Sequence, residues 1–359
     1  MSNHTKTYRI AAIPGDGIGI EVVEVALEVL QTVAEVTGGF TIKAAELPWG
    51  SAFYKKNGYY LPPDFLDTLK EYDAILFGAV GAPDVPDHES LWGLLLKMRG
   101  PMQLYANMRP IRCFTKPRLE GADPAHLDWL LVRENSEGEY SGHGGRSHGG
   151  REWEVATETS IYTRHGVCRI MRHAFEAASR RPRKHLTVVS KSNALRHGLV
   201  LWDEIAAEVA AEFPDVSWDK ELVDAMTIRM VQKPWTIDTV VGTNLHIDIL
   251  SDLAAALAGS IGIAASANLD PTRTNPSMFE PVHGSAFDIM GKGIANPIGA
   301  IWAAADMIAW LGEQSAADSI MDAIASVCKD GKVTADMGGT LNTKQTAEAI
   351  CLAIKSRHT

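Results

Sequence analysis

The chain has 359 residues, of which 46% are hydrophobic, so it is long enough to fill two cores of roughly 100 to 200 residues each. Its formal net charge of -10 and pI near 5.6 argue against a nucleic-acid backbone as a partner. The four cysteines form no CxxC pair, which argues against a zinc knuckle or a disulfide framework and favours reduced thiols in the cytoplasm. No apolar signal segment opens the sequence, and no apolar stretch is long enough to predict a membrane span.

Short apolar runs alternate with segments of helical period along the chain. The first run, YRIAAI at residues 8–13, predicts a strand, and the segment at 21–36 predicts a helix. The later runs that predict strands are FTIKAAEL, YDAILFGAV, LDWLLV, HLTVVS and DTVVGTNL. This alternation indicates an α/β fold built on a largely parallel sheet. The glycine-rich stretch at 141–159 interrupts the pattern, and the strand-like text after it, EVATETSIYT, predicts a small β arm suited to a dimer contact.

The turn PGDGIG, Pro14 to Gly19, follows the first strand and opens the first helix. Such a loop can bind a phosphate, but the glycines at 15, 17 and 19 do not form GxGxxG, and no acidic residue follows about 20 residues later. A tight strand-to-helix turn explains the glycines equally well. We infer no Rossmann fingerprint from this motif.

Three arginines, Arg99, Arg109 and Arg133, are candidates for anion binding. Single arginines usually lie on the surface, but Arg109 and Arg133 each close an apolar segment at the point where a strand would end. Ligands of α/β proteins bind at that edge of the sheet, and a guanidinium group matches a carboxylate. Three arginines would suit a dicarboxylate.

Tyr140 and Lys191 are candidates for proton transfer, and Asp248 and Asp252 for metal binding. The two aspartates lie four apart in NLHIDILSDLAA, so they share one face of a predicted helix and repel each other. A solvated helix face and a site for Mg²⁺ or Mn²⁺ both explain that spacing. Beside such an ion, Lys191 would lose its proton more readily and could act as a base.

The segment EPVHGSAFDIMGKGIANPIG at 280–299 reads either as a long structural loop or as a nucleotide cradle. In a cradle, the glycine backbones would approach the ligand closely and Asp288 would bind a ribose diol. An acidic residue there repels a 2′-phosphate, which favours NAD over NADP.

Together these segments resemble the β-decarboxylating dehydrogenases of isocitrate, 3-isopropylmalate, D-malate and tartrate. The resemblance covers essentially the whole chain. It is carried, in order, by PGDGIG, LYANMRP, VRENSEGEYSG, SKSN, VDAM, NLHIDILSD, EPVHGSAFDIMGKGIANP and TADMGGT. Ordered motifs along one chain are far more specific than any one of them.

The resemblance implies a role for each candidate. Arg99, Arg109 and Arg133 would bind the substrate carboxylates, Tyr140 would protonate an enolate, and Lys191 would help to remove the hydroxyl proton. The expected ligands of Mn²⁺ or Mg²⁺ are Asp224, Asp248 and Asp252, with K⁺ left open as a further ion. The residues expected to bind NAD are His283, Gly284, Ser285, Ala286, Asp288 and Asn296. In this family Lys191 and Asp224 would complete the neighbouring subunit's site, which implies a homodimer.

The implied fold is an isopropylmalate dehydrogenase-like fold of two lobes, with a large mixed, mostly parallel sheet and a small β arm, and is not a Rossmann domain. One lobe, on the cofactor side, would combine residues 1–104 with 262–359. The other, residues 105–261, would carry the dimer interface and the arm.

The segment ESLWGLLLKMR is expected to face the substituent on C3 of the substrate. Isocitrate enzymes place serine and asparagine where this chain has Gly93 and Leu95, so isocitrate is disfavoured. Isopropylmalate enzymes keep two leucines here but carry glutamate at the position of Trp92, which would fill the space of the isopropyl group if it points inward. The expected function is the NAD- and divalent-metal-dependent oxidative decarboxylation of D-malate to pyruvate and CO₂, with activity on tartrate as well. The alternatives are a 3-isopropylmalate dehydrogenase and a non-catalytic regulatory subunit.

Overall fold

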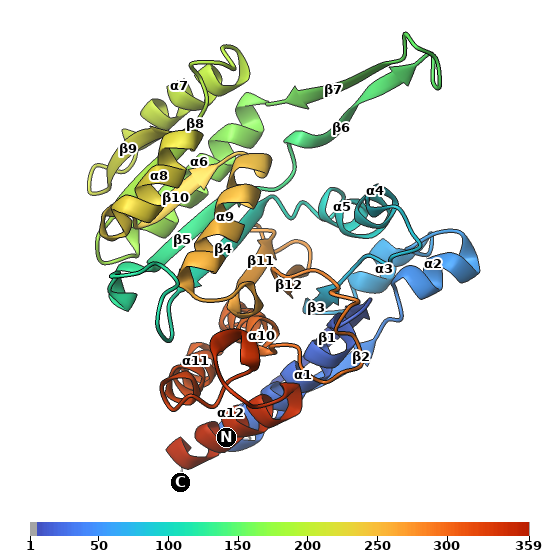
Figure 1. Cartoon of the computed structure of the whole chain (residues 1–359), viewed down its shortest axis with the longest axis vertical. Coiled ribbons are helices and arrows are strands. Elements are labelled where there is room, and N and C mark those ends of the chain that lie inside the picture. The colour runs from blue at the N-terminus through green and yellow to red at the C-terminus, as the bar shows by residue number, and fades with distance from the viewer. Residues whose placement is uncertain (1–5, 359) are drawn as a thin grey trace. The chain divides into compact units, whose positions relative to one another are not determined.

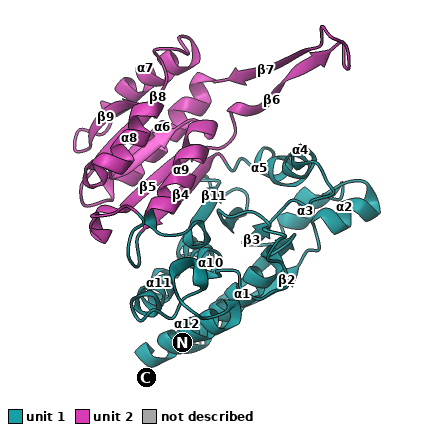
Figure 2. Cartoon of the chain, viewed as in Figure 1, with its two compact units in different colours: residues 1–104, 113–118, 258–359 teal, residues 105–112, 119–257 magenta. Residues whose placement is uncertain are grey.

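The computed structural model describes residues 6–358, which form two compact units (Figures 1 and 2). Unit 1 comprises the described residues up to Leu104, together with 113–118 and those from Ala258 onward, and unit 2 comprises 105–112 and 119–257. These bounds differ from the expected lobes, because Cys113–Arg118 belongs to unit 1 and the chain returns to unit 1 at Ala258. The segment 113–118 is tied to unit 1 by an edge-on contact of Phe114 with Trp302 and by a bond from the Arg118 guanidinium to the Gly259 carbonyl.

Unit 1 is built on strands in the order β2-β1-β3-β12-β11. Strands β1, β2, β3 and β12 pair in parallel, and β11 runs antiparallel to β12. The bounds of the strands are β1 Lys6–Gly15, β2 Phe40–Glu46, β3 Ala74–Ala79, β11 Ala265–Leu269 and β12 Ser277–Pro281. Every residue of β3 is buried, as expected for a parallel strand covered on both faces.

Helices cover both faces of the unit 1 sheet. On one face α1 and α10 lie against the strands, and α12 and α11 pack on them. On the other face, Ala11 and Ile13 of β1 join Ile75 and Phe77 of β3 in a hydrophobic cluster with Tyr60. The helices of unit 1 are α1 Gly19–Thr37, α2 Ser51–Asn57, α3 Phe65–Leu69, α4 Asp87–Ser90, η1 Leu91–Leu95, α5 Leu96–Arg99, η4 Ile261–Ile263, α10 Ile298–Leu311, α11 Gln314–Lys329, η5 Ala335–Met337 and α12 Thr343–His358.

Unit 2 is built on strands in the order β4-β5-β10-β8-β9, of which only β4 is antiparallel to its neighbour. The strands are β4 Ala106–Arg112, β5 Asp128–Glu134, β8 His185–Ser190, β9 Ser217–Leu222 and β10 Thr239–Gly242. Helix α6 packs against β5, β8 and β10, and α7 packs against α6. The helices are η2 Pro124–His126, α6 Arg164–Ser179, α7 Gly198–Ala210, α8 Val223–Gln232, η3 Pro234–Thr236 and α9 Asn244–Ala258. The expected α/β class with a mixed, mostly parallel sheet is confirmed.

The expected β arm is an antiparallel hairpin of β6 Gly138–Ser147 and β7 Val155–Ile161, which extends from unit 2 (Figure 1). The sequence pattern predicts a strand only in the second half of this hairpin, because the first half is rich in glycine. Glycine is required there by the close pairing of the strands, since a Cβ atom on Gly144 would lie 2.2 Å from the Thr157 carbonyl oxygen. Trp153 and Val155 are exposed on the arm.

Within residues 6–358, none of the helices combines the length and the apolar character that crossing a membrane requires.

Candidate active site

The acidic face of α9 is the centre of the candidate site in unit 2. Asp248 forms ion pairs with Arg109, at 3.1 Å, and with Arg133. The two arginines are themselves held, because Arg109 Nε donates to Asn107 Oδ1 and Arg133 Nε donates to Asn244 Oδ1. Both guanidinium groups are buried, and their cost of burial is offset by these bonds. The structure therefore brings together two of the three predicted arginines and one predicted metal ligand.

Tyr140 reaches the same carboxylate from β6. Its hydroxyl donates to Asp248 Oδ2 over 3.0 Å, and the Arg133 guanidinium lies 5.3 Å from the centre of its ring. A phenol beside two guanidinium groups and a carboxylate can donate a proton to a substrate that displaces the carboxylate.

Asp252 lies one helical turn after Asp248 on the same face of α9. Among residues 6–358 its carboxylate has no hydrogen bond or ion pair, and part of it contacts solvent. Surrounding protein atoms reduce its hydration and raise its pKa; the Arg109 charge opposes this rise, and the Asp248 charge adds to it. Two carboxylates on one face, one of them unpaired, are a donor set that suits a hard divalent cation.

Asp224 lies elsewhere in unit 2, at the start of α8, where it accepts a hydrogen bond from Lys191. This bond lowers the pKa of Asp224. In the described part of the chain no three acidic, histidine or cysteine side chains converge on one point that could hold a metal ion. A single copy of the chain thus does not bring Asp224 to Asp248 and Asp252.

Arg99, the third predicted arginine, is in unit 1. It is buried at the end of α5, where its Nη2 donates to Glu280 Oε1 over 2.8 Å, and Asn268 Nδ2 donates to the same oxygen. Its Nε is buried without a hydrogen-bond partner among the described residues. Trp92 and Leu95 precede it on η1; Trp92 is 43% exposed, whereas Leu95 packs in part against the hydrophobic cluster.

The predicted cofactor loop follows β12 in unit 1. His283 is buried, its Nδ1 lies 3.0 Å from the Gly284 carbonyl oxygen, and its Nε2 is buried with no partner in residues 6–358. Burial lowers the pKa of this imidazole, which favours the neutral form of the ring. Asn296 donates from Nδ2 to Asp336 and accepts from the Ile298 amide. An orphaned ring nitrogen in a glycine-rich loop fits a polar ligand such as a nucleotide.

Three other residues of this loop are predicted to bind the cofactor. Ser285 accepts a hydrogen bond on its carbonyl oxygen, Ala286 has a left-handed backbone with φ of 39°, and Asp288 is exposed. An exposed carboxylate is free to bind a diol.

The PGDGIG motif is a tight turn in this structure. The Ile18 amide donates to the Ser285 carbonyl, the Asp16 amide to Ala79 and the Gly19 amide to Asp16. Because these amides are already bonded, the turn supports the cofactor loop and does not present the donors of a phosphate cradle.

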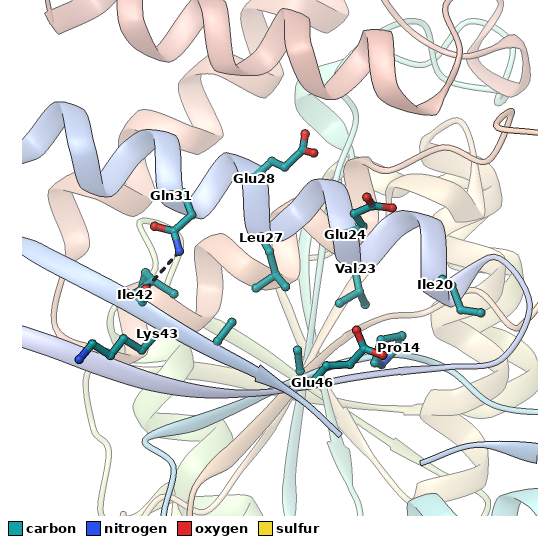
Figure 3. Close-up of a pocket in the computed structure, with 12 residues that line it drawn as sticks. Pro14, Ile20, Val23, Glu24, Leu27, Glu28, Gln31, Ile42, Lys43 and Glu46 are labelled. Carbon is teal, nitrogen blue, oxygen red and sulfur yellow. Dashed lines mark hydrogen bonds between the residues drawn. The ribbon is translucent and has the colours of Figure 1, made fainter. Parts of the chain in front are cut away.

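A groove of about 980 Å³ on unit 1 lies between α1 and β2 (Figure 3). Apolar Val23 and Leu27 face Ile42 across it, and Gln31 Nε2 donates to the Ile42 carbonyl over 3.1 Å. None of the predicted site residues lines this groove, so it is separate from the candidate site.

Several residues of the site are not indicated by the sequence. Glu280 stands at the start of a predicted loop, and nothing in its local pattern indicates a buried partner for Arg99. Asn107 lies two residues before Arg109 in ANMRP, and Asn244 lies four residues before Asp248 in NLHIDILSD, so nearness to a predicted residue is the signal that the sequence offers for both.

Comparisons with known proteins show the family to which the chain belongs. A family model described as isocitrate/isopropylmalate dehydrogenase matches residues 9–350. A probable tartrate dehydrogenase/decarboxylase of Agrobacterium vitis is 60% identical over 351 residues, covering 97% of this chain and 96% of the relative. The D-malate dehydrogenase [decarboxylating] of Escherichia coli K12 is 50% identical over 358 residues, covering 97% and 99%.

Among solved structures, isocitrate dehydrogenase from Methylococcus capsulatus matches with a TM-score of 0.88 and 38% identity, covering 97% of this chain and 99% of that one. The chain belongs to the isocitrate/isopropylmalate dehydrogenase family.

Proposed function

We propose that this protein is an NAD- and divalent-metal-dependent dehydrogenase that oxidatively decarboxylates D-malate to pyruvate and CO₂ and also acts on tartrate. Its coarser class, a decarboxylating dehydrogenase of this family, is supported by relatives named for D-malate and tartrate. The observation that carries the proposal is the cluster of Arg109, Arg133, Tyr140 and Asp248, which joins carboxylate binding, a proton donor and an acidic ligand in one place.

The protein residues have distinct tasks in this reaction. Arg109 and Arg133 bind the substrate carboxylates by paired N–H donors and fix the orientation of the 2-hydroxy acid. Tyr140 holds a proton at its hydroxyl and delivers it to C3 after the β-carboxylate has left as CO₂. Lys191, from the neighbouring subunit of a homodimer, assists in removing the proton of the C2 hydroxyl.

Two bound groups would complete the site. Asp248 and Asp252, with Asp224 from the neighbouring subunit, would hold Mn²⁺ or Mg²⁺, and His283 to Asn296 would hold NAD. When bound, NAD supplies the hydride acceptor and the metal supplies Lewis acidity at the C2 oxygen. Asp288 favours NAD over NADP, because its carboxylate would repel a 2′-phosphate.

A second candidate function is 3-isopropylmalate oxidation. It is favoured by the two leucines, Leu95 and Leu96, which remain on the segment expected to face the C3 substituent. Trp92 argues against it if its indole occupies the space that an isopropyl group needs.

The test is NADH formation by the purified protein with Mn²⁺ and K⁺, comparing kcat/KM for D-malate, L-tartrate and 3-isopropylmalate while evolved CO₂ is measured. Dominance of D-malate with one CO₂ per NADH supports the proposal. If kcat/KM is highest for 3-isopropylmalate, the second function is supported instead. Formation of NADH without CO₂ refutes the decarboxylating reaction.

A further inference from the structure

The segment that carries Trp92 and Leu95 is not a regular α-helix. Between α4 and α5, residues Leu91–Leu95 form a π-helical turn, in which the Leu96 amide donates to the Leu91 carbonyl five residues earlier. A π turn holds more residues than an α turn, so it changes the direction of the side chains before it relative to those after it. The end of the segment is fixed, because Arg99 is bonded to Glu280. The π turn therefore sets the direction of Trp92 relative to Arg99.

Gly93, in the middle of this turn, lies directly on the ring of Tyr60. A Cβ atom at position 93 would be 2.6 Å from Tyr60 Cδ2 and 3.4 Å from both Cγ and Cε2. The backbone of Gly93 is outside the left-handed region, so the need for glycine comes from space and not from φ. Any larger residue must displace either the turn or the ring.

The Tyr60 ring is held too firmly to be the part that moves. It is 2% exposed and stacks on Tyr54 with 4.6 Å between ring centres. Its hydroxyl lies 3.0 Å from Ser51 Oγ, and Ser51 donates its own proton to Asp16 over 2.6 Å. Asp16 is in turn fixed by the Gly81 amide, so the ring is braced by three successive polar contacts as well as by packing.

We propose that the Tyr60 ring, through its contact with Gly93, holds the turn at Leu91–Leu95 and thereby sets which C3 substituents the enzyme accepts. Tyr60 is then a positioning residue, because it acts through Trp92 and Leu95 and does not touch the substrate. This inference rests on the proposed function, in which these two side chains face C3. A methyl group added at position 93 would push the turn away from the hydrophobic cluster, towards the side where Trp92 is exposed.

Kinetics with acids that differ at C3 can detect this displacement. D-malate has no substituent on C3 other than its carboxylate, whereas L-tartrate carries a hydroxyl and 3-isopropylmalate a branched alkyl group. In the proposed function Trp92 and Leu95 lie beside C3, so moving the turn affects the three acids unequally. For Gly93→Ala we expect the kcat/KM ratios of D-malate to L-tartrate and of D-malate to 3-isopropylmalate to change by about tenfold.

The chain offers a matched control and a compensating variant. Gly100→Ala adds the same methyl group just after α5, where its nearest neighbour would be the Leu96 carbonyl oxygen at an ordinary 3.7 Å. It should leave both ratios within about twofold of the wild type. The double variant Tyr60→Leu with Gly93→Ala removes the ring that the methyl group strikes, and should return the ratios towards the wild type.

The experiment measures kcat and KM for the three acids, the Kd of NAD⁺, the Tm, and hydrogen exchange of residues 91–96 in all four proteins. For Gly93→Ala we expect altered kcat/KM ratios between the acids, faster hydrogen exchange of the Leu96 amide and an unchanged Kd of NAD⁺. Equal loss on all three acids, with a lowered Tm and no change in ratio, would overturn the inference and leave Gly93 a purely structural glycine. A wild type that oxidises none of the acids would instead overturn the proposed function itself.

Discussion

Asp252 is the residue on which the proposed metal site most depends, because Asp248 already has ion pairs to two arginines. We predict that Asp252→Asn abolishes metal-dependent turnover while the metal-free protein is as stable as the wild type or more so by a few tenths of a kcal/mol. The reason is that the substitution removes the repulsion with Asp248 and an acid whose pKa is raised. Turnover against Mn²⁺ concentration and the Tm without metal are the measurements.

The matched control is Asp215→Asn, which removes the same charge from an exposed position in unit 2 outside the site. It should leave turnover unchanged. Retention of wild-type activity by Asp252→Asn at ordinary Mn²⁺ concentrations would contradict the ligand set.

His173 on α6 provides a prediction for pH. Burial, together with the Arg180 charge, lowers its pKa to about 4, and its Nε2 is buried without a partner among the described residues. The unfolded chain takes up a proton near pH 6.5, but the folded protein does not do so until about pH 4. The contribution of His173 to the free energy of unfolding is therefore fully present above pH 6.5. It is lost as the pH drops towards 4, which lowers the free energy of unfolding by up to about 3 kcal/mol.

Replacement of His173 by leucine, which cannot take up a proton, should remove this part of the acid sensitivity. The measurement is the free energy of unfolding by urea at pH 7.5, 5.5 and 4.5. An equal loss of stability with acid in both proteins would show that other groups cause it.

Single-residue roles were predictable from the sequence where they depend on local spacing. Asp248 and Asp252 share a helix face by their four-residue separation alone. The contact of Arg133 with Asp248 joins residues 115 apart, and that of Arg99 with Glu280 joins residues 181 apart. No local pattern encodes such pairs, so neither contact was predicted. The family resemblance implied only that Arg133 binds a substrate carboxylate and that Asp248 binds a metal.

At the scale of elements, the turn between β1 and α1 supports the cofactor loop. Gly17 has φ of 58°, and a Cβ atom there would lie 1.9 Å from the Ser285 carbonyl oxygen. We predict that Gly17→Ala weakens NAD⁺ binding by at least about tenfold and lowers stability by about 1–3 kcal/mol, because it breaks the bond from Ile18 to Ser285. Calorimetric titration with NAD⁺ and urea unfolding measure the two effects.

Gly38 at the end of α1 is the control for this prediction. Its φ is 67°, but a Cβ atom there would meet nothing within 4 Å. Gly38→Ala should therefore cost about 1 kcal/mol of stability and leave NAD⁺ binding unaffected. Similar binding losses in both variants would mean that general destabilisation, not the contact with Ser285, is the cause.

Elements with strong periodicity were predictable, and those fixed by tertiary contacts were not. The segment at 21–36 predicts α1, which spans Gly19–Thr37. The π turn at Leu91–Leu95 has no sequence signature; its contacts are tertiary, with Gly93 lying on the Tyr60 ring and Arg99 bonded to Glu280. The glycine-rich β6 was not predicted, because backbone pairing with β7 forms it without β-prone side chains.

At the scale of the whole molecule, the order of strands could not be read from the alternation of elements. Alternation predicts a largely parallel sheet but does not say which strands run antiparallel. These are β11 and β4, and segment 113–118 returns to unit 1. In unit 1 the returning segment is held by the contact of Phe114 with Trp302. Family resemblance supplied the two-lobe plan, and the contacts of 113–118 refine where its boundaries fall.

The proposed homodimer makes a quantitative prediction about shared sites. If each site uses Tyr140 from one subunit and Lys191 from the other, Tyr140→Phe and Lys191→Ala homodimers are both inactive. A mixed dimer then has one site carrying both substitutions and one site carrying neither. After random exchange of subunits about half of the dimers are mixed, so mixing equal amounts should restore about one quarter of the wild-type activity.

Within one chain Lys191 is bonded to Asp224, whereas Tyr140 is bonded to Asp248, and this separate pairing supports the proposed division. The measurement is NADH formation before and after brief partial denaturation and refolding of the mixture, with each variant alone treated in the same way. If both residues served the same subunit's site, every site of a mixed dimer would carry one substitution and no activity would return. Recovery near one quarter is therefore expected only when Lys191 acts across the subunit boundary.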